Sequence, residues 1–228
     1  MLMAEDHRRV RVLQILEPDS DPLPEQDGGS AAALLDYLGR ARSTLDHERA
    51  EAPALAAELL ALPQDIREER LRRDPRFHTW GLAELLLGRS AEAREDPAEA
   101  GRLAALALAG ADALDRTRHA APVVEDLKAR AWAAAGEACL RRGDPAGAEE
   151  ALRAAASCLS RGTGDLLVEA RLLEFEAYVR RGQARPGEAA ALLKMAAARY
   201  REIGDVPLLE RTLAERDALL WQQPARPA

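Results

Sequence analysis

Histidines, cysteines and paired carboxylates are the residues of this chain that could carry out acid–base, nucleophilic or metal chemistry. No HExxH motif or Cys/His cluster brings together the four histidines, which are His7, His47, His78 and His119. Cys139 and Cys158 are too few for a tetrahedral zinc site, and their small or apolar surroundings are typical of buried free thiols. Acidic pairs such as Glu149–Glu150 are expected on solvated helix exteriors. Since there is also no phosphate loop, GxSxG motif or dinucleotide fingerprint, the sequence predicts no catalytic residue, no metal and no cofactor.

Two arginines, Arg42 and Arg73, are each followed five residues later by a histidine, His47 and His78. This spacing resembles the Arg-x4–6-His motif of the helical HEPN ribonucleases. With 30 arginines and four histidines in 228 residues, chance supplies about 1.6 such pairs over the three allowed spacings. Pro75 also interrupts the helix of the second pair. A ribonuclease is therefore kept only as a minor alternative.

The elements that must position any site are expected to be helices. Hydrophobic residues make up 47% of the chain but aromatic residues only 4%, so the core must consist mostly of alanine and leucine. These two residues lead the helix-propensity scale, and no convincing strand pattern appears after residue 17. The composition therefore predicts an all-α fold.

The overall charge and hydropathy limit the expected partners. The net charge is −7 and the isoelectric point is about 5.3, so nucleic acid is not an expected partner. No apolar run is long enough to cross a bilayer, and the N-terminus lacks the core of a signal peptide. We therefore expect a cytoplasmic protein with no membrane partner.

Changes in composition divide the chain into four segments. Residues 1–29 are expected to be a flexible arm and linker, in which the apolar run Val10–Leu16 could be a docking arm or a helix of its own. Residues 30–75 are an N-terminal helical segment, expected as helices Ser30–Glu48 and Pro53–Leu62 followed by a short charged stretch. Residues 76–205 contain paired helices. Residues 206–228 are expected to be a capping helix and a tail.

The clearest helix pair spans Trp132–Ala155. A basic last turn and Gly143 end its first helix, and Asp144 and Pro145 are a natural N-cap and first residue for the second. Small or apolar residues share one face of the pair at helical spacing, which predicts closely packed antiparallel helices: Gly136, Ala148, Leu152 and Ala155.

The same pattern recurs at fixed offsets. A shift of 48 residues towards the N-terminus aligns Gly136 with Gly88 and Asp144–Pro145 with Asp96–Pro97. It also aligns Ala148 with Ala100 and Ala155 with Ala107. A shift of 41 residues towards the C-terminus aligns Gly136, Ala148, Leu152 and Ala155 with Ala177, Ala189, Leu193 and Ala196. The sequence therefore predicts about three helical hairpins.

The central pair resembles the tetratricopeptide repeat family, and the chain looks like a bacterial protein that contains such repeats. The positions that match the family pattern are Trp132, Gly136, Gly143, Ala148, Leu152 and Ala155. The resemblance covers about half of the chain and implies a right-handed α–α superhelix, or solenoid, whose stacked hairpins leave a concave groove. The spacings of 48 and 41 residues exceed the family's repeat of about 34 residues, so an irregular superhelix is expected.

The resemblance also implies which first-helix positions line the groove. In the three units these are Leu82, Leu85, Arg89 and Glu92, then Arg130, Ala133, Glu137 and Leu140, and then Arg171, Glu174, Tyr178 and Arg181. Their mixture of arginine and glutamate could be a solvated, salt-bridged surface. It could instead be a mixed-charge groove with Tyr178 as an aromatic anchor.

The sequence therefore favours a non-enzymatic adaptor or scaffold that binds a protein or peptide in the groove. The main alternative is a regulatory sensor domain that binds a peptide or small ligand and controls a partner protein. The polar last helix suggests an end cap, and we expect a monomer or a weak homodimer.

Overall fold

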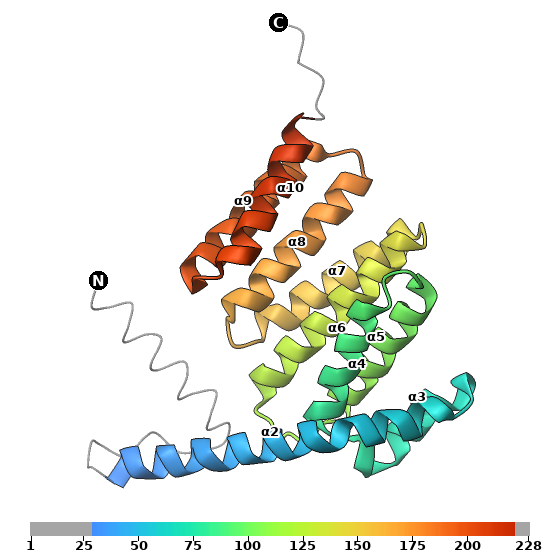
Figure 1. Cartoon of the computed structure of the whole chain (residues 1–228), viewed down its shortest axis with the longest axis vertical. Helices are drawn as coiled ribbons and strands as arrows, with labels where there is room; N and C mark the ends of the chain where they lie inside the picture. The colour runs from blue at the N-terminus through green and yellow to red at the C-terminus, as the bar shows by residue number, and fades with distance from the viewer. Residues whose placement is uncertain (1–28, 222–228) are drawn as a thin grey trace, which may run out of the picture.

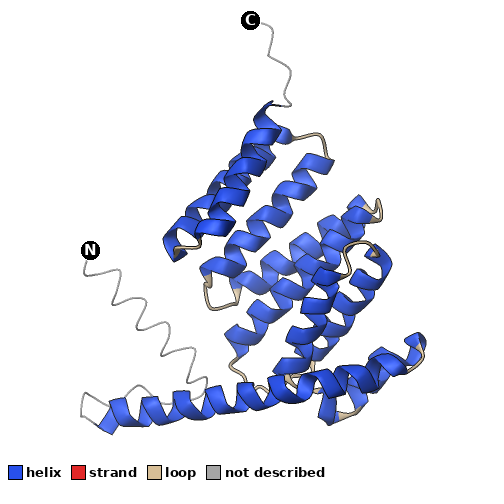
Figure 2. Ribbon diagram, in the orientation of Figure 1, coloured by secondary structure: helices blue, strands red, loops and turns tan. Residues whose placement is uncertain are grey.

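The computed structural model describes residues 29–221, and over this range the chain contains nine α-helices, one short 3₁₀ helix and no strand (Figures 1 and 2). The predicted all-α class is confirmed for these residues. The predicted docking segment Val10–Leu16 and the final tail lie outside them. No described helix is both long and apolar enough to cross a membrane. The helices are α2 (Gly29–Ala61), α3 (Gln64–Arg73), α4 (Trp80–Glu92), α5 (Pro97–Asp112), α6 (Ala121–Arg141), α7 (Pro145–Ser160), α8 (Leu166–Gly182), α9 (Pro186–Ile203) and α10 (Val206–Trp221).

Short capped turns define the three helix pairs α4–α5, α6–α7 and α8–α9. The carboxylates of Asp96 and Asp144 accept backbone N–H bonds at the starts of α5 and α7, as predicted. The proline that follows each of them fits the first helical turn because its missing N–H would have no partner there. Gly143 has a φ of +76°, a left-handed conformation that glycine adopts without a Cβ penalty.

The pairs pack one after another along the chain. In the central pair α6 packs against α7, so the predicted adjacency of Trp132–Leu140 and Ala148–Ala155 is confirmed. Helix α6 also contacts α4 on one side and α8 on the other, while α5 contacts α6 and α7 contacts α8 (Figure 1). Helix α10 packs against α9 and ends the described row of helices.

Gly136 allows the central helices to approach closely. A Cβ placed on it would lie 2.2 Å from the Phe175 ring and 2.9 Å from the Cβ of Ala151. Gly88, which the offset aligned with Gly136, has no atom within 4 Å of its ideal Cβ position and is exposed. The prediction that Gly88 defines the first repeat in the same way is therefore wrong, because that part of α4 faces solvent.

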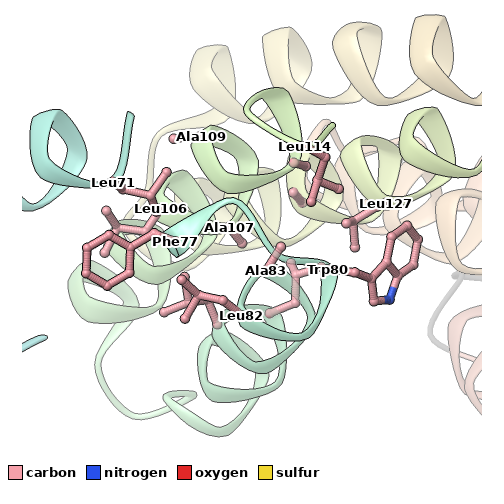
Figure 3. Close-up of a cluster of buried hydrophobic side chains, with 14 of the residues drawn as sticks. Leu71, Phe77, Trp80, Leu82, Ala83, Leu106, Ala107, Ala109, Leu114 and Leu127 are labelled. Atoms are coloured by element: carbon pink, nitrogen blue, oxygen red, sulfur yellow. The ribbon is translucent and has the colours of Figure 1, made fainter. Parts of the chain in front are cut away.

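The largest hydrophobic cluster lies where α2, α3, α4, α5 and α6 meet. In Figure 3, Leu71 and Phe77 lie together at one end of this cluster, Trp80 and Leu127 lie at the other end, and Leu82 lies between them. Many of its other members are leucine and alanine, as the composition predicts. Smaller clusters lie between α6, α7 and α8 and between α8, α9 and α10.

The N-terminal helices differ from the expected pattern. One helix, α2, runs from Gly29 to Ala61 with Pro53 inside it, so the predicted break before Pro53 is wrong. Pro53 is exposed, while its helix neighbours Ala52, Ala56 and Leu59 are buried, and this packing stabilises the helix across the missing backbone bond. The charged stretch that follows forms α3.

The first paired helix begins later than its sequence pattern suggests. Pro75–Phe77 forms a 3₁₀ turn, and α4 starts at Trp80, where the Thr79 side chain accepts the backbone N–H of Leu82. The segment of paired helices, expected from residue 76, therefore has its first α-helix only from Trp80 onward. As a result, Trp80 lies at the N-terminus of α4, directly against α2.

Candidate functional site

The candidate binding face lies along α4, α6 and α8, the three first helices of the pairs. Its centre is Glu137 on α6, whose side chain is 42% exposed and lies 3.9 Å from the guanidinium of Arg141. Electrostatic interactions connect Glu137 with Arg94, which follows α4, and with Arg171 on α8. Glu137 thus lies within the electrostatic influence of three arginines from three successive pairs, of which Arg171 is also paired with Glu174 at 3.3 Å. We call Glu137 and these three arginines the Glu137 cluster.

The Glu137 side chain is partly exposed, and neighbouring charged groups and partial burial both act on its carboxyl group. Desolvation is the largest influence on it and raises its pKa above the ordinary value. The nearby charge of Glu174 acts in the same direction, whereas Arg141, Arg171 and Arg94 oppose it. Within the cluster three arginines accompany one carboxylate, so the cluster carries an excess of positive charge, which the pairing of Arg171 with Glu174 reduces.

Glu174 was predicted to line the groove, but only 3% of it is exposed. Its carboxylate accepts hydrogen bonds from the hydroxyls of Tyr200 at 2.8 Å and Thr212 at 2.7 Å. It also pairs with Arg211 at 2.9 Å. The prediction is therefore corrected, because Glu174 joins α8 to α9 and α10 and is not free to bind a partner.

Tyr178 and Arg181 also contact α10. The Tyr178 hydroxyl donates to Glu215 at 3.1 Å, and the Arg181 guanidinium lies 3.3 Å from the same carboxylate and 5.3 Å from the centre of the Tyr178 ring. Burial, reinforced by the charges of Glu215 and Glu174, raises the pKa of Tyr178. The proposed aromatic anchor is half-buried beneath a helix that the groove prediction had not placed there.

The other predicted groove positions fall into two groups. The side chains of Arg89, Glu92 and Arg130 make no hydrogen bond or close ion pair with another described residue, and Glu92 and Arg130 are exposed. Arg130 acts on Glu84 and Asp126 only through its charge. Leu82 was also predicted for the groove, but it is fully buried in the main core. The remaining three apolar positions are half-buried against core clusters: Leu85, Ala133 and Leu140.

A second arrangement, which the sequence did not reveal, joins α2 to the starts of α4 and α6. Glu48 is 5% exposed, accepts the backbone N–H of Trp80 at 2.6 Å and lies 3.2 Å from the His119 imidazole. The Trp80 and His119 rings lie 5.9 Å apart between centres. Burial alone would raise the pKa of Glu48, but the His119 contact and the Trp80 and Gly81 amides together lower it. No sequence motif links these residues, which lie up to 71 positions apart.

A cavity of about 670 Å³ lies beside this arrangement. Its walls include His47 and Leu45 from α2, Trp80 from α4, and Arg118 and His119 from the connection before α6. Two of the four histidines, expected to be scattered, therefore share one cavity. His7 lies outside the described residues.

The two Arg–His pairs make contacts within their own segments. Arg42 pairs with Asp46 and His47 with Glu51, each one helical turn away. In the second pair, the His78 Nε2 atom lies 2.9 Å from the carbonyl oxygen of Leu71. The described residues contain no group of three or more histidine, cysteine or acidic side chains arranged to hold a metal ion.

Comparison with protein-family models, curated proteins and solved structures finds no match. The functional argument therefore rests on the geometry of these two arrangements.

Proposed function

We propose that the protein is a non-enzymatic binding module of the tetratricopeptide type. In this proposal the helix pairs stack as an irregular solenoid, and the face along α4, α6 and α8 binds a segment of another protein. The Glu137 cluster is the observation that best supports it. Side chains from three successive pairs meet there without forming a close ion pair with Glu137, as a surface that recognises an extended chain requires.

The charge of the cluster favours an acidic partner segment. Arg94, Arg141 and Arg171 outnumber the nearby carboxylates of Glu137 and Glu174, so the cluster favours anions although the whole protein carries a net charge of −7. Arginine guanidinium groups bind carboxylates through paired hydrogen bonds.

Affinity capture from the source cell with charge-reversed variants tests the proposal. The double variant Arg94→Glu/Arg141→Glu should lose a partner that the wild-type chain captures. Arg153→Glu provides a matched control, because Arg153 is exposed on the second helix of the same central pair. A partner retained by the double variant, or no specific partner at all, would contradict the proposal.

The cavity beside Trp80 favours a second candidate function, a regulatory sensor that binds a small ligand. Its volume lies within the range of about 300–1,000 Å³ typical of ligand sites. A ligand-dependent rise in melting temperature without any partner protein would support this second function.

A further inference from the structure

The cavity between α2 and the start of α6 has its own physical origin. Helix α2 crosses α4 so closely at Gly81 that an added Cβ would lie 2.3 Å from the carbonyl oxygen of Glu48. Before this crossing, α2 continues away from the other helices, as Figure 1 shows. The connection containing Arg118 and His119 forms the opposite wall. The space is therefore a wedge fixed at one end by the contacts of Glu48 with Trp80 and His119.

The lining combines an apolar body with nitrogen-bearing side chains. Leu45, Trp80 and Val123 supply apolar surface, and Arg118, His47 and His119 supply groups that are cationic or can become so. None of the described residues that line the cavity is acidic, although Glu48, Glu51 and Asp115 contact His119, His47 and Arg118 from outside the lining. Arg118 is the only permanent cation of this lining, so the cavity favours an anionic ligand group over a cationic one at its position.

The side chains that would hold such an anion are partly preorganised. Trp80 and His119 are 9% and 7% exposed, and Glu48 contacts the backbone N–H of Trp80 and the His119 imidazole. Arg118 is 69% exposed, and its ion pair with Asp115 is long at 3.8 Å, so its guanidinium can turn towards a ligand at little cost. Asp115 would keep its contacts with the backbone N–H and hydroxyl of Thr117.

We propose that this cavity binds a small organic acid with a flat apolar body, such as an aromatic carboxylate. The carboxylate would pair with Arg118 at the mouth, and the ring would lie against Trp80 and Leu45. This site is separate from the Glu137 cluster, so it can be tested independently of the peptide-binding proposal.

Calorimetric titration of the full chain with 2-naphthoate tests this inference, with uncharged 2-naphthamide as the comparison ligand. Arg118→Gln should weaken 2-naphthoate binding about ten-fold, because the charge-assisted pair is lost. Arg116→Gln is the matched control, since Arg116 lies in the same connection, does not line the cavity and should leave the affinity within about two-fold. The wild-type chain should bind 2-naphthamide about ten-fold more weakly than 2-naphthoate.

A cavity-filling variant supplies a second test that does not depend on charge. Ala41→Trp adds a large ring to a half-buried lining position on α2 and should abolish 2-naphthoate binding while the helical circular dichroism is preserved. The inference is overturned if wild type does not bind 2-naphthoate, if Arg118→Gln binds it normally, or if Ala41→Trp still binds it. Light scattering that shows a dimer closed over this face, with no naphthoate binding, would assign the cavity to a second copy instead.

Discussion

Glu174 carries its charge inside the molecule because donors from three helices reach it. The hydroxyls of Tyr200 and Thr212 and the guanidinium of Arg211 all contact its carboxylate, with Arg171 at 3.3 Å from its own helix. A buried carboxylate is tolerated only when its lone pairs are satisfied in this way. Glu174 therefore links α8, α9 and α10 into one packed unit.

Glu174→Ala should lower the free energy of unfolding by about 3 kcal/mol, because it leaves the buried Tyr200 hydroxyl and Arg211 without their acceptor, while Thr212 keeps the Leu208 carbonyl at 2.8 Å. Urea unfolding followed by circular dichroism measures the change. Glu210→Ala, at an exposed position on α10, should stay within about 0.5 kcal/mol of wild type. Equal stability of the two variants would show that the buried contacts contribute nothing.

Glu48 makes a pH-dependent contribution to stability. Its pKa lies below the ordinary value of 4.5 because the His119 and backbone contacts outweigh burial. A carboxyl group with a lowered folded-state pKa stabilises the fold above its ordinary pKa. That stabilisation is lost as the pH falls through the lower folded-state value.

Glu48→Gln should therefore cost about 1–2 kcal/mol of stability at pH 7, since a charge-assisted acceptor at the start of α4 is replaced by a neutral one. The difference from wild type should narrow as the pH falls below about 4.5. Urea unfolding at a series of pH values from 7 to 3 measures it. A difference that stays constant or widens on acidification would contradict this role of Glu48.

At the scale of elements, the crossing of α2 and α4 depends on the absence of one side chain. Gly81 faces the backbone of Glu48, and neither backbone can move without disturbing the Trp80 and His119 contacts. Gly88 lies on the same helix but faces open space. Gly81 and Gly88 therefore lie on one helix but in different surroundings, one against a backbone and one in open space.

Gly81→Ala should destabilise the protein by about 3 kcal/mol through overlap with the Glu48 carbonyl. Gly88→Ala should stabilise it by about 0.5–1 kcal/mol, because alanine favours the helix and meets no neighbour. Thermal and urea unfolding of both variants give the comparison. Destabilisation by both changes, or by neither, would argue against the described crossing.

Local sequence signals predicted the helices of residues 80–221 well because caps act within a few residues. Asp96–Pro97 and Asp144–Pro145 placed the starts of α5 and α7, and Gly143 placed the end of α6. The N-terminal region was harder to predict because Pro53 is a local break signal that long-range packing of α2 overrides. Likewise, nothing near Gly88 in the sequence indicated that its side of α4 would face solvent.

At the scale of the whole molecule, α10 closes the C-terminal end of the row of helices. Its Leu219 completes a cluster with Ala177, Ala189 and Leu193. On the neighbouring surface, Leu208 and Leu209 pack against the cluster of Tyr200. An end helix of this kind covers apolar surface that the last pair would otherwise expose.

Truncation after Ile203 should lower the melting temperature by about 10 °C and promote aggregation, because it exposes these clusters and removes two donors from Glu174. Differential scanning calorimetry and light scattering measure the two effects. Trp221→Ser is the control, since Trp221 is 89% exposed and its replacement should change stability by less than about 0.5 kcal/mol. A truncated chain as stable as wild type would show that α10 is not a cap.

The sequence alone determined the helical class, the paired arrangement and most helix boundaries after Trp80, because helix propensity, caps and apolar spacing are local properties. Tertiary structure decided which charged residues are buried. Glu174, which was expected in the groove, is buried because α10 covers it, whereas the Glu137 side chain stays partly exposed. Tertiary structure also brought Glu48, Trp80 and His119 together beside one cavity. Such contacts join residues far apart in the chain, and the burial of a charge depends on donors that only the folded chain brings to it.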